Sequence, residues 1–445
     1  MGREKIAIIG GGSPFTPGYI DSIIREISVF SGSEICLMDI DPSRLPVLAN
    51  IGAKMIKEKD VNLKITRTTK KDVALKDATF ILTTFRVGGV QHLRYDFEIP
   101  TKYGIFGEET AGPGGTFMAQ CTIPVMLDYC NTMEKLCPDA WVVNYVNPTN
   151  FVADAVRRVT DIKIISLGDG AIWLWSEVLP SILRVPREDI KVRTGGLNHN
   201  TWLLQLLIKG KDGYPLLRKR AEELLETGNK SAVPKGWGCA PYHAEDWSDP
   251  LFGLKLLKIY GCLPVTPGHG LMYWVHDELM ASRSQEWKFL PEFEEEIDRR
   301  FRNFELIADG KKPLEKFGSG HGDLAIQVMA NIAGSRGEEI IVNVPNKGAI
   351  WNLPSEAIVE VPAVVDGSGA KPLCVGSVPK SILGLILHLL NWQELTVDAA
   401  LSGDKNVLLQ ALLACPYVHS LKAADKILEE LLAAHAPYMP QFKNA

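Results

Sequence analysis

The sequence predicts an α/β protein with an N-terminal, doubly wound parallel sheet and a C-terminal α+β domain. Three observations support this prediction. The apolar run Ile6–Ile9 breaks into Gly10-Gly11-Gly12, and a second apolar run ends at the acid Asp39. Strand-like and helix-like segments then alternate up to about residue 195. Short, wholly apolar runs suit strands buried on both faces, as in parallel sheets. We therefore expect domains at 1–195 and 196–445.

The expected elements of the first domain follow from apolar periodicity and turn residues. The strands are Lys5–Ile9, Glu34–Met38, Leu63–Thr66, Thr79–Thr83, Ala140–Asn144 and Lys163–Ser166. The helices between them include Thr16–Ile27, Leu45–Lys57, Thr122–Lys135 and Phe151–Val159. Pro42, directly after Asp41, is typical of the first-turn proline of a helix that an aspartate caps.

The second domain is expected to be rich in helices. Its helices are Tyr214–Leu225, Leu251–Tyr260, Leu290–Leu306, Asp323–Ile332, Lys380–Asn391 and Lys422–Ala434. Short extended segments, including Glu339–Val344 and Ile358–Val361, interrupt them. Without a low-complexity linker, this domain should dock firmly on the first and leave a cleft at the carboxyl ends of the strands.

The turn Gly10-Gly11-Gly12-Ser13 predicts a dinucleotide site. Glycines let the backbone turn and approach a phosphate without an intervening side chain. Asp39 would lie where the ribose 2′-hydroxyl of NAD lies, and it would repel the 2′-phosphate of NADP. The pattern departs from Gly-x-Gly-x-x-Gly, so a purely structural turn is the alternative interpretation.

Composition excludes several classes of protein. The 445-residue chain is 46% hydrophobic and 23% charged, as in ordinary globular proteins. Its formal charge of −5 provides no basic stripe for nucleic acid. No apolar run is long enough to span a membrane, and no signal peptide precedes the first strand. Eight scattered cysteines without CxxC pairs indicate buried thiols in a reducing cytoplasm.

Polar clusters follow several expected strands and should converge on the cleft. They are Thr83–Gly89, Glu108–Gly115, Asn144–Asn150, Ser166–Gly170 and Gly196–Asn200. Each alone is compatible with ordinary turn chemistry. Their recurrence after successive strands favours a functional site.

The same segments resemble glycoside hydrolase family 4. The resemblance runs from residue 5 to beyond residue 380. It rests on Thr84-Phe85-Arg86-Val87-Gly88-Gly89, Arg94, Asp96, Ile99-Pro100, Lys102-Tyr103-Gly104, Glu109-Thr110, Gly112-Pro113-Gly114-Gly115, Cys137–Trp141, Asn144–Pro148, Gly196–His199 and Val342–Ile350. It implies a lactate/malate dehydrogenase-like, Rossmann-type scaffold and an NAD-dependent glycosidase, an exception to the usual pair of carboxylates. In that chemistry, NAD⁺ oxidises C3 of the sugar, a base removes the C2 proton, the aglycone leaves, water adds and hydride returns.

The resemblance also assigns candidate site residues. Cofactor positions are Gly10, Gly12, Ser13, Phe15, Asp39, Thr83 and Asn144, and substrate positions are Arg94, Glu109, Asn147 and Asn198. Tyr273, His199 and Asp169 are the catalytic candidates. Two purely structural interpretations stay open: Arg94 as a solvated or ion-paired helix residue, and Tyr273 as a core aromatic beside Trp274.

The metal position departs from the family pattern. Family members carry a cysteine ligand for a divalent metal, usually Mn²⁺, where this chain has Gly168. His199 matches the family's histidine ligand, and Asp169 offers a carboxylate to a hard cation. Alternatively, His199 acts without metal, by hydrogen-bonding the sugar or as an acid or base. The presence of a metal therefore stays open.

The substrate is expected to be a small glycoside. Arg86–Gly115 is similar to members that cleave 6-phosphoglycosides, but Leu271 and Met272 cannot bind a phosphate, which leaves a neutral sugar or uronic acid open. Two other functions also remain: a net NAD-dependent sugar dehydrogenase on the same scaffold, and a non-catalytic NAD- or sugar-binding protein. By resemblance, the chain would form a homodimer or homotetramer.

Overall fold

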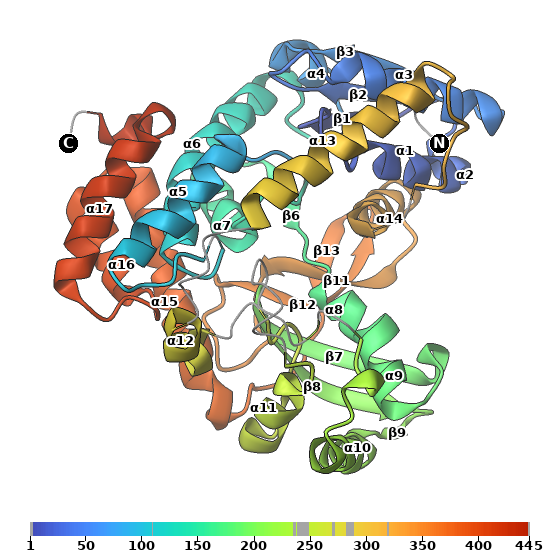
Figure 1. Cartoon of the computed structure of the whole chain (residues 1–445). Helices are drawn as coiled ribbons and strands as arrows, with labels where there is room; N and C mark the ends of the chain where they lie inside the picture. The colour runs from blue at the N-terminus through green and yellow to red at the C-terminus, as the bar shows by residue number, and fades with distance from the viewer. Residues whose placement is uncertain are drawn as a thin grey trace.

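The structure of the chain is a computed structural model (Figure 1). It describes residues 3–108, 110–234, 237, 249–268, 272–281, 289–317 and 320–443. Within this part of the chain, no helix is long and apolar enough to cross a membrane.

A mixed sheet forms the centre of the molecule. Its main path runs β10-β8-β7-β12-β11-β6-β5-β4-β1-β2-β3, with β13 beside β12 and β9 beside β8. The strands are β1 (Lys5–Ile9), β2 (Glu34–Met38), β3 (Lys64–Thr68), β4 (Phe80–Thr83), β5 (Trp141–Asn144), β6 (Lys163–Ser166), β7 (Ile190–Leu197), β8 (Asn200–Ile208), β9 (Lys211–Asp212), β10 (Leu263–Pro264), β11 (Glu338–Pro345), β12 (Ile358–Asp366) and β13 (Gly369–Pro372).

Strands β1 to β6 are parallel, in the order 3-2-1-4-5-6 of a doubly wound dinucleotide-binding sheet. The expected α/β class is confirmed. From β6 onward, every neighbouring pair is antiparallel. The expected boundary at 195/196 falls inside β7 (Ile190–Leu197), and the two-domain division stays a prediction.

Helices cover the sheet (Figure 1). They are α1 (Thr16–Arg25), α2 (Ile27–Phe30), α3 (Leu45–Glu58), α4 (Lys71–Leu75), α5 (Gly89–Lys102), α6 (Pro113–Leu136), α7 (Thr149–Val159), α8 (Gly170–Trp173), α9 (Leu179–Leu183), α10 (Tyr214–Thr227), α11 (Phe252–Tyr260), α12 (Met272–Ala281), α13 (Phe289–Ala308), α14 (Gly320–Gly334), α15 (Lys380–Ser402), α16 (Lys405–Ala414) and α17 (Leu421–His435). The C-terminal helices α15, α16 and α17 gather on one side, against α5 and α6.

Two sequence expectations need correction. Pro42 is not a first-turn proline, because α3 begins at Leu45 and Pro46 occupies its first turn. Asp41 instead accepts hydrogen bonds from the backbone N–H of Ser43 at 2.9 Å and from its hydroxyl at 2.8 Å, which makes a local turn before the helix. Among the described cysteines, Cys374 is exposed rather than buried; the other six are buried, and none forms a disulfide.

Candidate functional site

The first candidate feature is the turn between β1 and α1. Gly10 has φ = +88°, and a Cβ there would lie 2.3 Å from the carbonyl oxygen of Thr84. The backbone N–H groups of Gly10 and Gly11 both donate to Met38 O, at 2.9 and 2.7 Å. Only glycine combines this backbone conformation with this closeness to the next strand. The turn therefore lies directly on the carboxyl ends of β1 and β2.

Asp39 lies at the end of β2 and faces the same turn. Its Oδ2 accepts a hydrogen bond of 2.9 Å from the backbone N–H of Gly12. Ser13 Oγ accepts from Phe15 N–H at 3.3 Å, and the ring of Phe15 is 44% exposed just before α1. The structure thus brings together Gly10, Gly12, Ser13, Phe15 and Asp39, as expected for a dinucleotide site.

Thr83 and Asn144 lie deeper, at the ends of β4 and β5. Thr83 Oγ1 donates to Asn144 Oδ1 at 2.7 Å, and Asn144 Nδ2 donates to Ser166 Oγ at 3.0 Å. Asn144 also bonds Val146 and Thr149, and its side chain has no exposed surface. These side chains join β4, β5 and β6, so their direct contact with a cofactor stays a prediction while their structural role is evident.

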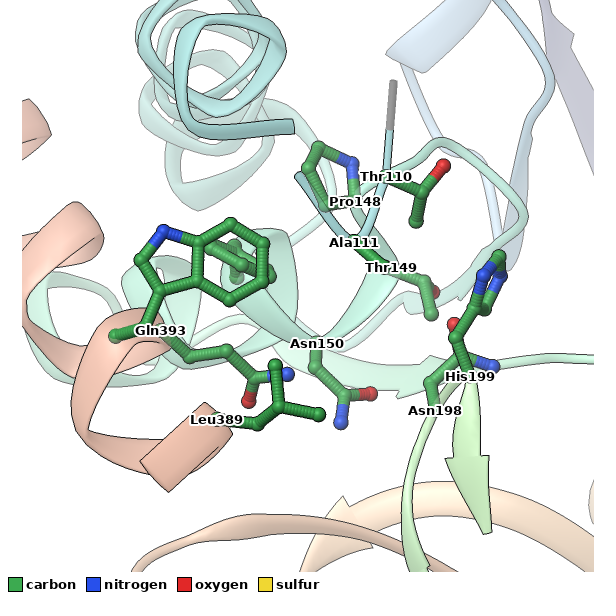
Figure 2. Close-up of a pocket in the computed structure, with 11 residues that line it drawn as sticks. Thr110, Ala111, Pro148, Thr149, Asn150, Asn198, His199, Leu389 and Gln393 are labelled. Atoms are coloured by element: carbon green, nitrogen blue, oxygen red, sulfur yellow. The ribbon is translucent and has the colours of Figure 1, made fainter. Parts of the chain in front are cut away.

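A narrow pocket lies beyond the ends of β5 and β6 (Figure 2). Its lining comes from four places: the turn before α6, the start of α7, the β7–β8 turn and α15. The lining residues are Thr110, Ala111, Pro148, Thr149, Asn150, Phe151, Asn198, His199, Leu389, Trp392 and Gln393. None of them is an acid, a lysine or an arginine, so the lining suits a polar, uncharged group.

Asn198 and His199 form the two-residue turn between β7 and β8, whose flanking residues Leu197 and Asn200 pair with each other. His199 has φ = +66°, an unusual conformation for a non-glycine residue that typically costs about 1–3 kcal/mol. Such conformations concentrate at functional sites. The turn projects both side chains into the pocket (Figure 2).

Helix α15 supplies the opposite wall. Trp392 Nε1 donates to Thr116 Oγ1 in α6 at 2.9 Å, and its ring packs edge-on against Phe151 of α7 at 5.1 Å between centroids. These contacts fix Gln393 beside Asn150 (Figure 2). Asn150 Nδ2 donates to Ile358 O at 3.1 Å, whereas its buried Oδ1 has no hydrogen-bond partner within the described part of the chain. A buried acceptor without a partner favours binding of a hydroxyl group at this position.

Gly168 and Asp169 follow β6 beside this pocket. Asp169 Oδ1 accepts a hydrogen bond of 3.1 Å from the hydroxyl of Tyr145. A Cβ on Gly168 would lie 2.4 Å from Asn198 Nδ2 and 2.8 Å from Glu360 Oε2. The space for a side chain at residue 168 is therefore already filled.

The described residues do not fit the divalent metal that the resemblance implies. Gly168 offers no side-chain donor where the family has its cysteine. Across the residues with described side chains, no group of three or more His, Cys, Asp and Glu is placed to hold a metal ion. His199 is thus not accompanied by the ligands of a protein-built metal site.

The remaining candidates are dispersed. Arg94, on α5, is 42% exposed and lies 4.0 Å from Glu98. Asn147 is half-buried directly before Pro148, which lines the pocket, and Glu109 lies outside the described residues.

Tyr273, on α12, is half-buried against Trp274 and Tyr417 and donates to Leu385 O at 3.4 Å. Burial raises the pKa of Tyr273 well above its usual value, and the residue is not part of the pocket lining. These surroundings are those of a core aromatic; the base role stays a prediction.

Sequence reasoning missed Glu360, on β12. This carboxylate is 2% exposed and accepts hydrogen bonds from Asn198 Nδ2 at 2.8 Å and Asn343 Nδ2 at 3.3 Å. Burial raises the pKa of Glu360, although these hydrogen bonds act in the opposite direction. The sequence did contain a signal for Glu360, because it is the single acid inside the apolar run Ile358–Val365. A carboxylate in such a strand needs polar partners, since carboxylates are almost never fully buried without them.

Fold and site together define an α/β enzyme built on a dinucleotide-binding sheet. The chain belongs to family 4 of the glycosyl hydrolases. The model of the family 4 glycosyl hydrolase matches residues 5–181, and that of the family's C-terminal domain matches residues 194–418. The expected family is confirmed.

Relatives of known name agree with this assignment. The probable 6-phospho-beta-glucosidase of Bacillus subtilis (strain 168) is 31% identical, over 99% of this chain and 98% of the relative. The crystal structure of a 6-phospho-alpha-glucosidase from gut microorganisms, in complex with NAD and Mn²⁺, is 26% identical and has a TM-score of 0.86 over 99% of this chain and 100% of that one. The lactate dehydrogenase of Eimeria maxima has a TM-score of 0.53 at 13% identity, over 91% and 96% of the two chains, and shares the fold alone.

Proposed function

We propose that this chain is an NAD-dependent glycosidase that cleaves a small 6-phosphorylated glycoside. The observation that carries the proposal is that the Gly10–Ser13 turn, which contacts Asp39, and the uncharged pocket both lie at the carboxyl ends of strands of one sheet. In such sheets, dinucleotide and substrate meet at that edge. Membership of family 4 supplies the reaction class.

The cofactor residues fit NAD. Gly10 and Gly12 would admit the pyrophosphate to the backbone at the start of α1, and Asp39 would bind the ribose 2′-hydroxyl. Phe15 offers an exposed apolar face beside them. When bound, NAD supplies reversible removal of hydride from C3 of the sugar.

The pocket residues would then orient the sugar and move its protons. Asn198 and His199 of the pocket lining, together with Asn147 directly before the lining residue Pro148, would hydrogen-bond sugar hydroxyls, and Tyr145 would hold Asp169 in place. Tyr273 is the proposed base for the C2 proton, which a ketone at C3 makes acidic. Its deprotonation requires a cation or a shift of α12 that offsets burial. With the C2 proton gone, the aglycone leaves C1 and water replaces it.

The relatives support a phosphorylated sugar, whereas Leu271 and Met272 left a neutral sugar or uronic acid open. The two glucosidases compared above carry 6-phospho names. Residues 269–271 lie outside the described residues. Arg94 is the proposed partner for the substrate's charge, because it is half exposed and its contact with Glu98 is a weak surface ion pair.

A net sugar dehydrogenase is the second candidate. The observation that favours it is the lack of a fitting metal-ligand set at Gly168 and His199. Elimination passes through an enediolate whose charge needs stabilisation, whereas hydride transfer needs only a base that takes the hydroxyl proton.

The proposed function is tested with nitrophenyl glycosides, with and without a 6-phosphate, incubated with NAD⁺ in the presence of EDTA or Mn²⁺. The proposal expects NAD⁺-dependent release of nitrophenol from a 6-phosphoglycoside without accumulation of NADH. Accumulation of NADH without nitrophenol supports the dehydrogenase, and neither product supports a binding protein.

We further propose a cytoplasmic homodimer or homotetramer with domains at 1–195 and 196–445. The unpaired state of the seven described cysteines suits a reducing compartment. Exposed Leu413, Leu421 and Tyr438 on and beyond the C-terminal helices offer apolar area for self-association. Light scattering of the purified chain tests the assembly.

A further inference from the structure

A row of polar residues crosses the sheet where its parallel part meets its antiparallel part. Asn343 on β11 pairs with Ser166 on β6 and with Glu360 on β12, and Glu360 pairs with Gly196 on β7. The row connects the strand before Gly168 to the strand before the Asn198–His199 turn. Strands β6 and β7 are far in sequence from β11 and β12, and the register of the sheet brings the residues of the two pairs together.

Glu360 is the charged member of this row. Its Oε2 accepts from Asn198 Nδ2 at 2.8 Å and from Asn343 Nδ2 at 3.3 Å, and the residue is 2% exposed. A buried carboxylate is costly unless hydrogen bonds satisfy it, so the Asn198 amide is strongly held.

This hydrogen bond also fixes which end of the Asn198 amide faces the pocket. Because Nδ2 donates to Glu360, Oδ1 is the atom left to accept a hydrogen bond. Asn198 lines the pocket next to His199. An acceptor in this position suits a hydroxyl of the sugar.

Gly168 is the third part of the arrangement. A Cβ there would lie 2.4 Å from Asn198 Nδ2 and 2.8 Å from Glu360 Oε2. Any side chain at residue 168 would push the amide and the carboxylate apart. The Asn198–Glu360 contact thus requires a glycine at residue 168.

We propose that Gly168, Asn198 and Glu360 form one unit, in which Glu360 is a positioning residue that holds the Asn198 carbonyl toward a sugar hydroxyl. The proposal rests on the proposed function. It adds a determinant of sugar binding that lies outside the pocket and acts through Asn198.

The test compares Glu360→Gln, Gly168→Ala, Asn198→Ala and the double variant Glu360→Gln/Asn198→Ala. Glu360→Gln is nearly isosteric but allows the facing amide to flip. We expect KM for the glycoside to rise about tenfold or more in each single variant, with a smaller effect on kcat and unchanged NAD affinity. We expect the double variant to match Asn198→Ala alone.

Two matched controls separate this role from a structural one. Gly384→Ala adds a methyl group where nothing lies within 4 Å, and Glu339→Gln alters an exposed carboxylate paired with Arg193. Both should keep the wild-type KM. A wild-type KM in Glu360→Gln, or multiplicative losses in the double variant, would overturn the proposal.

A second readout needs no turnover. The NMR signals of the Asn198 side-chain amide are assigned by their loss in Asn198→Ala. Their chemical shifts should change in Glu360→Gln and in Gly168→Ala and should stay unchanged in Gly384→Ala. Unmoved signals would reject the unit itself. If these signals move but the wild-type protein hydrolyses no glycoside, the proposed function fails and the unit stands.

Discussion

The backbone N–H of Gly12 donates a hydrogen bond of 2.9 Å to Oδ2 of Asp39. A Cβ on residue 12 would lie 2.7 Å from the same oxygen, so the glycine and the acid are packed against each other. The contact joins the two sequence features that predicted a dinucleotide site. We propose that the fixed negative charge of Asp39 distinguishes NAD from NADP.

Asp39→Asn tests this charge. The amide keeps an acceptor for Gly12 but removes the repulsion of a 2′-phosphate, which is about 1–4 kcal/mol for two charges at 4 Å near a surface. We expect the preference for NAD over NADP, measured by titration of both cofactors, to fall about tenfold or more. Asp41→Asn, two residues away, should keep the wild-type preference. An unchanged preference in Asp39→Asn would contradict the assignment.

Gly10→Ala tests the close approach of the turn to β4. Its Cβ would lie 2.3 Å from Thr84 O at φ = +88°. Gly210→Ala is the matched control, because Gly210 has φ = +79° with nothing within 4 Å of an added Cβ. We expect the control to lose about 1–2 kcal/mol of unfolding free energy through backbone strain alone. Gly10→Ala should lose more in denaturant titrations and bind NAD at least tenfold more weakly; equal effects would show that the turn is not close-packed.

Tyr273→Phe tests the proposed base. The hydroxyl makes one described hydrogen bond, at 3.4 Å, so the variant should keep its fold. We expect exchange of the C2 proton with solvent deuterium to fall about 10²-fold or more. Because burial raises the pKa of Tyr273, exchange in the wild type should increase as the pH rises through the neutral range.

The control for that variant is Tyr417→Phe. Tyr417 packs against Tyr273, and its buried hydroxyl has no hydrogen-bond partner within the described part of the chain. The Tyr417→Phe variant should exchange the C2 proton of the sugar at the wild-type rate. If Tyr273→Phe does the same, Tyr273 is a core aromatic and the base is another residue.

His92→Gln tests a second titrating group, at the contact between α5 and α17. His92 Nδ1 lies 2.6 Å from His435 Nδ1, and His435 Nε2 lies 2.9 Å from Asp96 Oδ1. Burial and the neighbouring His435 lower the pKa of His92 from 6.5 to about 4. The unfolded chain therefore takes up this proton at a higher pH than the folded chain, and stability is lost as pH falls from about 6.5 to about 4.

We expect the Tm of His92→Gln to decrease less between neutral and mildly acidic pH than the Tm of the wild type. His388→Gln, which changes an exposed histidine on α15, should follow the wild type. A wild-type pH dependence in His92→Gln would show that other groups control acid stability.

Local sequence was sufficient for much of the fold. The bounds of β1, β2 and β6 were predicted correctly, because each is an apolar run that a polar or turn residue ends. Helix α3 began where expected, but Pro42 was assigned to it wrongly, since a turn at Asp41 competes with a helix cap for the same residues.

The site was predictable only where a single loop carries it. The Gly10–Ser13 turn and the Asn198–His199 turn are local, and Asp39 was found because it directly ends the apolar run of β2. Glu360 contacts Asn198 because the register of β7 and β12 pairs Glu360 with Gly196, and no local sequence pattern encodes that register. Sequence also could not tell that Asn144 turns inward to hold three strands together.

The most direct measurement is the hydrogen isotope at C2 of the sugar released in D₂O from a 6-phosphoglycoside with NAD⁺, together with NADH absorbance. We predict one solvent deuterium at C2 per aglycone released, with no net NADH. Aglycone release with the original hydrogen retained at C2 would contradict oxidation-assisted elimination and, with it, the proposed function.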